Sequence, residues 1–169
     1  MNEERMNTIW GNIFKLKQKE EDEICSVLRK VPMFEDLDAR ELGQIERILH
    51  RREYRSEETI FLQGDPGLGM YIIEEGSVDI VSEPSKQVLA ELEAGEFFGE
   101  LALLDESPRT ATAVAKTPCR MLCFFRPDLL DLIERSPRLG VKILFRLARI
   151  LGERLKKTNL QMHELNKGQ

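Results

Sequence analysis

The stretch GEFFGELALLDESPRTATAVA, residues 95–115, combines two glycines, several acidic residues and a single arginine. A glycine-rich turn leads into a short apolar run, and a Pro-Arg-Thr tripeptide then leads into a strand-like segment. Backbone N–H groups are free at the start of a helical turn, and Gly99 would let an anion approach them closely. Arg109 is the only basic residue between Lys86 and Lys116, and its planar guanidinium can hold two oxygens of one phosphate. These features predict a phosphate-binding turn.

Glu100 adds a second requirement to this turn. An ionised carboxylate only accepts hydrogen bonds, so Glu100 would repel a phosphate but would suit a nearby hydroxyl, such as the 2′-OH of a ribose. A ligand that carries a phosphate and a sugar hydroxyl close together would satisfy both Arg109 and Glu100. The other carboxylates around the turn are expected to be surface charge: Glu91, Glu93, Glu96, Asp105 and Glu106.

The segments around this stretch predict a small antiparallel barrel. Gly, Pro, Asp and Ser turns separate short runs of strand-forming residues. These runs are residues 59–63, 70–74, 77–82, 87–93, 110–115 and 120–125. Many short strands at this spacing are typical of a jelly roll or a small closed barrel.

Helical periodicity marks both ends of the chain. The expected helices are residues 5–17, 22–29, a segment within 34–49, 129–134 and about 139–165. Asp36 or Asp38 can cap the third of these helices. The first contains Met6, Ile9, Trp10, Ile13 and Phe14 on one face. We expect it to pack on its own domain or on a dimer mate, and the alternative is a membrane-surface or partner-binding helix.

The long C-terminal helix contains a short heptad seam. Residues step by three and four along it, at Ala148, Leu151, Leu155, Thr158, Met162 and Leu165. A seam of about two and a half heptads predicts a homodimer, and packing against the chain's own barrel is the alternative. The same helix is basic, which we interpret as a solvated face. Its basic residues are Lys142, Arg146, Arg149, Arg154, Lys156 and Lys157.

Composition narrows the function classes. The 169 residues are 41% hydrophobic and 33% charged, which is typical of one soluble domain with a packed core. A net charge of −5 disfavours nucleic-acid binding through a globally basic surface. No apolar run approaches the roughly 20 residues that a bilayer-spanning helix needs. The N-terminus MNEERMNTIW lacks the basic start and apolar core of a signal peptide, so we expect a cytoplasmic protein.

The cysteines and histidines argue against disulfide, metal and enzyme chemistry. Cys25, Cys119 and Cys123 are too few and odd in number for a disulfide framework, and the last two are interpreted as core thiols. The only histidines, His50 and His163, are far from them, which disfavours zinc or the clustered histidines of a metal-dependent cupin. We therefore expect a binding protein with no cofactor.

The opening stretch resembles a known family. FGELALLDESPRTATAVA, residues 98–115, looks like the phosphate-binding cassette of cyclic-nucleotide-binding domains, as in bacterial cAMP receptor proteins and protein kinase A regulatory subunits. The matched pattern is F-G-E-L-A-L, a short spacer, then P-R-T-A-T. The resemblance extends to GMYIIEEGSVDIV before the cassette and to the helices after it, about residues 28–165.

The resemblance implies an α+β fold, in which N-terminal helices and a long C-terminal helix flank an antiparallel β jelly-roll barrel. Residues 1–27 would be an N-terminal helical extension. Residues 28–135 would be the nucleotide-binding barrel with its cassette at 95–113. Residues 136–169 would be a C-terminal lid or dimerisation helix.

The resemblance also implies roles for single residues. Glu100 would bind the ribose 2′-OH and Arg109 the cyclic phosphate. Backbone amides would complete the phosphate site near Gly99, Leu101, Ala102, Thr110 and Ala111. The expected base contacts are apolar at Ile80, Leu89 and Leu92, and polar at Thr158 and Asn159, the last two reaching in from the opposite subunit.

The expected function is a bacterial sensor of cyclic nucleotides that signals to an unidentified effector protein through its C-terminal helix. Thr158 and Asn159 favour cAMP, and Thr110 makes cGMP a competitor. An interaction scaffold with an unused pocket is the alternative. A DNA-associated regulator is less favoured, and sequence-specific DNA binding is not expected, because only four residues follow Leu165 where a helix-turn-helix needs several tens.

Overall fold

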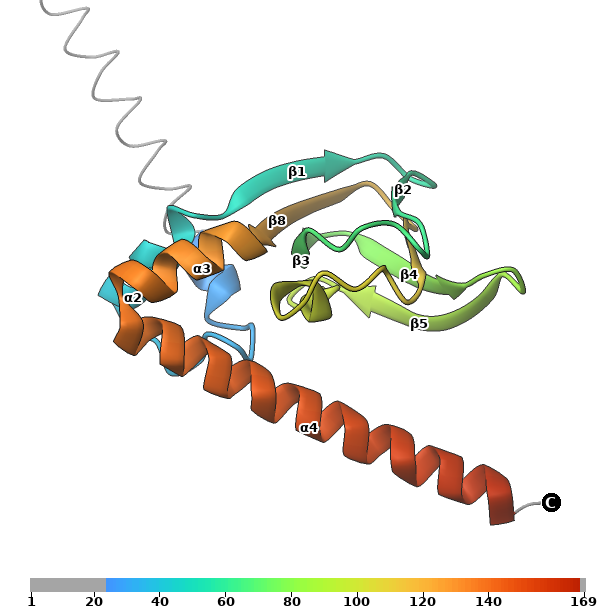
Figure 1. The fold of residues 1–169 in the computed structure, drawn as a ribbon. Coiled ribbons are helices and arrows are strands. Elements are labelled where there is room, and N and C mark those ends of the chain that lie inside the picture. Colours follow the sequence, from blue (N-terminus) through green and yellow to red (C-terminus); the bar gives the residue numbers. More distant parts are fainter. Residues whose placement is uncertain (1–23, 168–169) are drawn as a thin grey trace, which may run out of the picture.

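The computed structural model describes residues 24–167, with side chains described through residue 163. The helix expected over residues 5–17 lies outside the described residues. Within them the chain folds into two antiparallel sheets of four strands each, with helices at one end and a long helix along one side (Figure 1). The expected α+β fold, a jelly-roll barrel with flanking helices, is confirmed.

The eight strands are divided between the two sheets in the order of a jelly roll. The first has the order β1-β8-β3-β6. It consists of β1 (His50–Tyr54), β8 (Cys119–Phe125), β3 (Gly69–Glu75) and β6 (Phe97–Phe98). The second has the order β2-β7-β4-β5. It consists of β2 (Thr59–Phe61), β7 (Thr112–Ala115), β4 (Ser77–Ser82) and β5 (Gln87–Glu93).

Two of these strands, β1 and β6, were not expected from the sequence. The β1 sequence HRREY is charged and largely exposed, since β1 is an edge strand, so it lacks the apolar alternation that marks a half-buried strand. The β6 strand is only two residues long, which is too short for any period. The other six strands lie within about two residues of their expected ranges.

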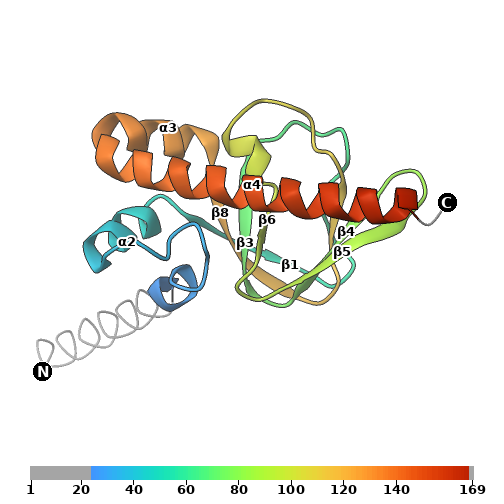
Figure 2. The same ribbon diagram turned by 90° about the horizontal axis from the view of Figure 1, so that it is seen from below.

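The helices gather at one end of the barrel and then run along it. A helical stretch at residues 24–28 precedes α2 (Ala39–Glu46), where Asp38 accepts a hydrogen bond from the Glu41 amide at 2.8 Å as the expected cap. A 3₁₀ turn, η1 (Glu100–Leu103), follows β6. The last two helices are α3 (Arg126–Arg135) and α4 (Pro137–Lys167). Figure 2 shows α4 crossing the barrel from α3 toward the turn between β4 and β5.

Two apolar cores hold these layers together. Alternate side chains of β3 point to opposite faces, so Met70 and Ile72 pack under the helices while Ile73 packs between the sheets. Phe34 and Phe124 join the first core with ring centroids 6.4 Å apart. Each such burial contributes about 1.5–3 kcal/mol. The first half of α4 is thereby fixed to the helical end, and its second half extends along the barrel.

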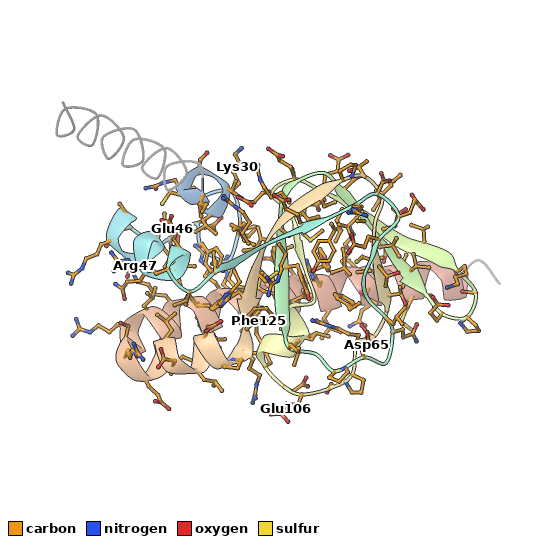
Figure 3. The ribbon with its side chains drawn as sticks, turned by 90° about the horizontal axis from the view of Figure 1, so that it is seen from above. Lys30, Glu46, Arg47, Asp65, Glu106 and Phe125 are labelled. Atoms are coloured by element: carbon orange, nitrogen blue, oxygen red, sulfur yellow. The ribbon has the colours of Figure 1, made fainter. Side chains whose placement is uncertain are left out.

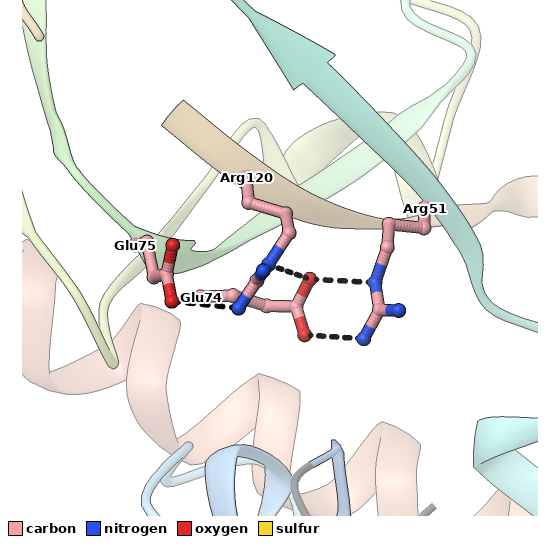
Figure 4. A network of polar contacts seen from close by, with 4 residues as sticks. All are labelled: Arg51, Glu74, Glu75 and Arg120. Carbon is pink, nitrogen blue, oxygen red and sulfur yellow. Dashed lines mark hydrogen bonds and ion pairs between the residues drawn. The ribbon is translucent and has the colours of Figure 1, made fainter. Parts of the chain in front are cut away.

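A cluster of charged side chains crosslinks the first sheet. The buried carboxylate of Glu74 accepts two hydrogen bonds from Arg51, from Nε to Oε2 and from Nη2 to Oε1, each 3.0 Å long. Arg120 Nε lies 3.7 Å from Glu74 Oε2, and its Nη2 donates to Glu75 at 2.6 Å (Figure 4). These pairs join β1, β3 and β8 side by side.

Candidate functional site

A cavity of about 580 Å³ lies between η1, the second sheet and α4. This volume is in the range of small-molecule sites. Its walls come from the cassette, from β2, β4, β5 and β6, and from the second half of α4. The lining residues are Phe61, Ile80, Ala90, Leu92, Phe97, Phe98, Gly99, Glu100, Leu101, Ala102, Asp105, Ser107, Pro108, Arg109, Thr110, Ala111, Arg154 and Lys157.

The turn before η1 requires a glycine. Gly99 has φ +72°, a left-handed conformation that residues with a Cβ adopt at a cost. A Cβ at this position would also lie 2.6 Å from Nη1 of Arg109. The backbone at Gly99 and the guanidinium of Arg109 therefore approach each other closely, and the approach of an anion to this turn stays a prediction.

Arg109 is held in place by neutral groups. Its Nη1 donates to the Gly99 carbonyl at 3.1 Å and its Nη2 to the Gly69 carbonyl at 2.7 Å. Its Cζ lies 4.1 Å from the centre of the Phe61 ring and 5.7 Å from that of Tyr71. The backbone N–H of Arg109 donates to the backbone carbonyl of Asp65 at 2.8 Å, so the loop that Figure 3 labels at Asp65 fixes the chain here.

The charge of Arg109 is buried without a counterion. The residue is 8% exposed, and no carboxylate of the described side chains lies within 4 Å of its guanidinium. Its Nε is buried with no hydrogen-bond partner among the described residues. Burial lowers the pKa of Arg109, and Tyr71, followed by the more distant Asp65 and Glu100, opposes this only in part. An unpaired buried cation is costly, so this arrangement favours binding of an anion.

Aromatic rings form the wall behind Arg109. Tyr71 stacks on Phe98 with ring centroids 5.3 Å apart, and Phe61 lies 5.7 Å from Tyr71. Burial raises the pKa of the Tyr71 phenol, which therefore stays neutral and supplies no negative charge to the arginine. The anion that balances Arg109 must come from outside this group of residues.

Glu100 is the second buried charge of the cavity, and α4 supplies its partner. The residue is 6% exposed, and its Oε1 accepts a hydrogen bond of 2.5 Å from Arg154 Nη1. Arg154 Nη2 also donates to the Phe97 carbonyl at 3.3 Å, and its Cζ lies 4.9 Å from the Phe97 ring. This contact attaches the second half of α4 to the cassette.

The structure brings most of the expected ligand residues to this cavity. Those that line it are Ile80, Leu92, Gly99, Glu100, Leu101, Ala102, Arg109, Thr110 and Ala111. Whether each of them contacts a ligand stays a prediction. Three expected residues do not line it: Leu89, Thr158 and Asn159.

The position of Leu89 differs from expectation because Leu89 and Leu92 lie three residues apart on β5, and a strand turns residues an odd number apart to opposite faces. Ile80 pairs with Ala90 and Val81 pairs with Val88, which leaves Leu89 without a partner between them. Ala90 and Leu92 then face the cavity, and Leu89 is 56% exposed. Ala90 and Leu92 keep the two-residue alternation of a regular strand, so periodicity pairs Leu92 with Ala90 and not with Leu89.

The residues of α4 that reach the cavity are Arg154 and Lys157, which sequence reasoning assigned to the solvent. Thr158 instead donates its hydroxyl hydrogen to the Arg154 carbonyl at 3.0 Å, and Asn159 is exposed. The spacing of buried residues carried the missing signal. Ile143, Leu147 and Ile150 face the barrel in steps of four and three, and the same steps lead to Arg154 and Lys157.

The described residues contain no group of three His, Cys, Asp or Glu side chains that could hold a metal ion. None of the described helices is long and apolar enough to cross a membrane.

Comparison with known proteins identifies relatives. The model of the cyclic nucleotide-binding domain matches residues 51–136. The cyclic AMP receptor protein of Thermus thermophilus is 36% identical over 138 residues, 80% of this chain and 62% of that protein. The cAMP-dependent protein kinase regulatory subunit of Schizosaccharomyces pombe is 34% identical over 120 residues, 67% of this chain and 29% of that subunit. The chain therefore matches only a part of each relative's length.

Solved structures agree with the sequence relatives. The catabolite activator protein of Thermus thermophilus superposes with a TM-score of 0.71 at 36% identity, covering 80% of this chain and 63% of that one. A cyclic nucleotide-binding domain from Methylobacillus flagellatus gives 0.74 at 27% identity, covering 85% and 82%. The cassette, the barrel and the relatives lead to the same conclusion: this chain belongs to the cyclic nucleotide-binding domain family.

Proposed function

We propose that this chain is a sensor that binds a purine cyclic nucleotide, cAMP or cGMP, in the cavity between the cassette and α4. The observation that carries the proposal is the guanidinium of Arg109, buried beside the cavity with no carboxylate within 4 Å among the described side chains. A cyclic phosphate would supply the missing negative charge. Its two exocyclic oxygens suit the planar fork of an arginine better than the point charge of a lysine.

The remaining walls suit the rest of such a ligand. Glu100 can accept a hydrogen bond from a ribose 2′-OH, and the apolar side chains of Ile80, Ala90 and Leu92 provide a surface for a flat base. The amides of the cassette would complete the phosphate site. We propose a regulatory role rather than a catalytic one, and a location in the cytoplasm. We also propose that the chain signals to an effector protein.

Signalling would begin at the contact between Glu100 and Arg154. A ribose hydroxyl that hydrogen-bonds Glu100 changes the strength of the 2.5 Å contact between Glu100 and Arg154. Ligand binding therefore changes how firmly α4 is held. A ligand shifts this equilibrium only by the difference in its affinity for the two helix positions. The effector would respond to the helix position.

We also propose that α4 pairs with a second copy of the chain. The expected seam used Leu151, but that side chain packs partly buried against the chain's own core. The face that stays uncovered carries Val141, Phe145, Ala148, Leu155 and Met162, and four of these large apolar residues are more than half exposed. Together with Gly152 and Asn159, which lie between them on the same face, these residues are spaced alternately four and three apart along the helix. A heptad seam of this kind suits a helix dimer.

Isothermal titration calorimetry with cAMP and cGMP tests the proposed ligand class. We expect saturable binding that is lost in Arg109→Ala and kept in Arg149→Ala, which removes an exposed arginine of α4 outside the cavity. A ligand at about 100 times its Kd should stabilise the native state by about 2.7 kcal/mol, visible as a raised Tm. No binding of either nucleotide to ligand-free protein would favour the interaction scaffold instead.

A further inference from the structure

The end of the cavity farthest from Arg109 is where a base would lie. Arg109 stacks on Phe61 of β2, whereas Ala90 and Leu92 belong to β5. The strands β2 and β5 are the two edges of the second sheet, three strand spacings apart, or about 14 Å along a flat sheet. A ligand whose phosphate meets Arg109 and whose ribose meets Glu100 would thus extend its base toward β5.

At this base end, α4 presents one unpaired charged side chain. Arg154 is engaged with Glu100 and with the Phe97 carbonyl. Lys157 lines the cavity one helical turn further on and forms no ion pair with any described side chain. The walls that it faces from β4 and β5 are apolar, so Lys157 is the group that can hydrogen-bond the edge of a base there. In Figure 2 this half of α4 crosses over the part of the barrel that contains β4 and β5, and Figure 1 shows that the helix stands apart from these strands.

A lysine ammonium offers three hydrogen-bond donors and no acceptor. Guanine presents two acceptors, N7 and O6, on its outer edge, whereas adenine presents the N7 acceptor next to a donor amino group at C6. Lys157 therefore complements a purine with a 6-oxo group and conflicts with the amino group of adenine. Thr158 and Asn159, which favour adenine in the sequence, lie outside the cavity of their own chain.

We propose that Lys157 is a specificity-determining residue that makes this pocket prefer a 6-oxopurine cyclic nucleotide, cGMP, to cAMP. This inference rests on the proposed function, because it assumes a cyclic nucleotide with its phosphate at Arg109. It changes the base preference expected from the sequence and leaves the phosphate and ribose contacts as they are.

Calorimetry on the full chain with cGMP, cAMP and cyclic IMP tests this inference. Cyclic IMP has the O6 and N7 acceptors of guanine but lacks its 2-amino group, which Thr110 could contact. We expect cGMP and cyclic IMP both to bind about tenfold tighter than cAMP, since one matched base contact gives discrimination of this order. If cGMP binds tightly while cyclic IMP binds as weakly as cAMP, the preference comes from the 2-amino group of guanine, and the proposed role of Lys157 is overturned. Tighter binding of cAMP would overturn it as well.

Two variants of Lys157 and a neighbour complete the test. Lys157→Met should weaken cGMP and cyclic IMP about tenfold and should not weaken cAMP, because it also removes the conflict with the adenine amino group. Lys157→Gln should shift the preference toward cAMP, because an amide matches the donor and acceptor of adenine. Lys156→Met is the matched control, since Lys156 is exposed and does not line the cavity.

Equal weakening of all three nucleotides in Lys157→Met would mean that Lys157 acts on the phosphate and would overturn the inference. A wild-type chain that binds none of the three would reject the proposed function, and the inference with it. These two failures are distinguishable because only the second removes binding from the unmodified protein.

Discussion

Two buried charges lie at the strand β3: Glu74 belongs to it, and Arg109 donates a hydrogen bond to the carbonyl of its first residue, Gly69. They differ in whether a group of opposite charge is bound to them. Glu74 and Arg109 are each 8% exposed. The Glu74 carboxylate is bound by Arg51 through two hydrogen bonds of 3.0 Å and lies 3.7 Å from Arg120. Arg109 has only carbonyl oxygens and aromatic rings around it among the described residues.

The comparison separates a structural charge from a ligand-binding one. Removing one member of a closed cluster leaves its partners buried and unpaired, so the cluster around Glu74 should matter for stability. Removing a charge that has no counterion relieves a cost, so Arg109 should matter for binding and little for stability. The two residues are thus predicted to give opposite results in the same pair of measurements.

The largest expected effect is on binding, in Arg109→Met. The neutral side chain of similar length should abolish cyclic nucleotide binding, a loss of about 3–5 kcal/mol, because the ligand phosphate would be buried unpaired. Titration calorimetry measures the loss. The free energy of unfolding without ligand, from urea denaturation, should change little, because the relieved burial of charge offsets the lost hydrogen bonds to the Gly69 and Gly99 carbonyls.

Arg109→Lys sharpens this result. It keeps the charge but not the planar fork, so it should bind more weakly than the wild type and more tightly than Arg109→Met. A large loss of ligand-free stability in Arg109→Met, with binding retained, would show that Arg109 is a structural residue and would remove the contrast with Glu74.

The next effect is on stability, in Glu74→Gln. The amide cannot satisfy Arg51 and Arg120, so we expect the free energy of unfolding to fall by about 2 kcal/mol. Water offsets part of the penalty because both arginine side chains are about one third exposed. Nucleotide affinity should not change. Reduced affinity at normal stability would place this cluster in the ligand response instead.

Where a short motif determines the geometry, the residues that the sequence predicted do line the cavity. The prediction failed where the position of a side chain depends on the register of a helix. Gly99, Glu100 and Arg109 lie in one contiguous stretch, so their relation follows from a single turn. The face of α4 that lines the cavity depends on how Ile143 and Leu147, several residues earlier, pack in the core. For this reason the sequence alone predicts Thr158 at the cavity, which Lys157 lines instead. The error at Leu89 has a different cause, since Leu89 and Leu92 lie an odd number of residues apart and a regular strand turns such a pair to opposite faces.

Gly99→Ala tests the close approach between the cassette backbone and Arg109. Gly95→Ala is a matched control, because both glycines have positive φ but a Cβ at Gly95 meets nothing closer than Lys30 at 4.0 Å. Both variants should lose about 1 kcal/mol of stability from backbone strain. Only Gly99→Ala, whose Cβ would lie 2.6 Å from the guanidinium, should also lose about tenfold in nucleotide affinity by displacing Arg109. Equal affinities in the two variants would show that the guanidinium adjusts freely.

The smallest effect concerns the ring that supports Arg109. Phe61→Leu keeps an apolar wall but removes the ring 4.1 Å from the guanidinium, so a cation–π interaction of about 1 kcal/mol is lost. Phe98→Leu is the control, since Phe98 also lines the cavity and belongs to the same aromatic cluster but has no such contact with Arg109. If the ring orients the arginine, Phe61→Leu should cost little affinity in a protein that already carries Arg109→Lys, because an ammonium group has no plane to orient. A loss of the same size in the Arg109→Lys background would mean that Phe61 contacts the nucleotide directly and leaves Arg109 positioned by the two carbonyls alone.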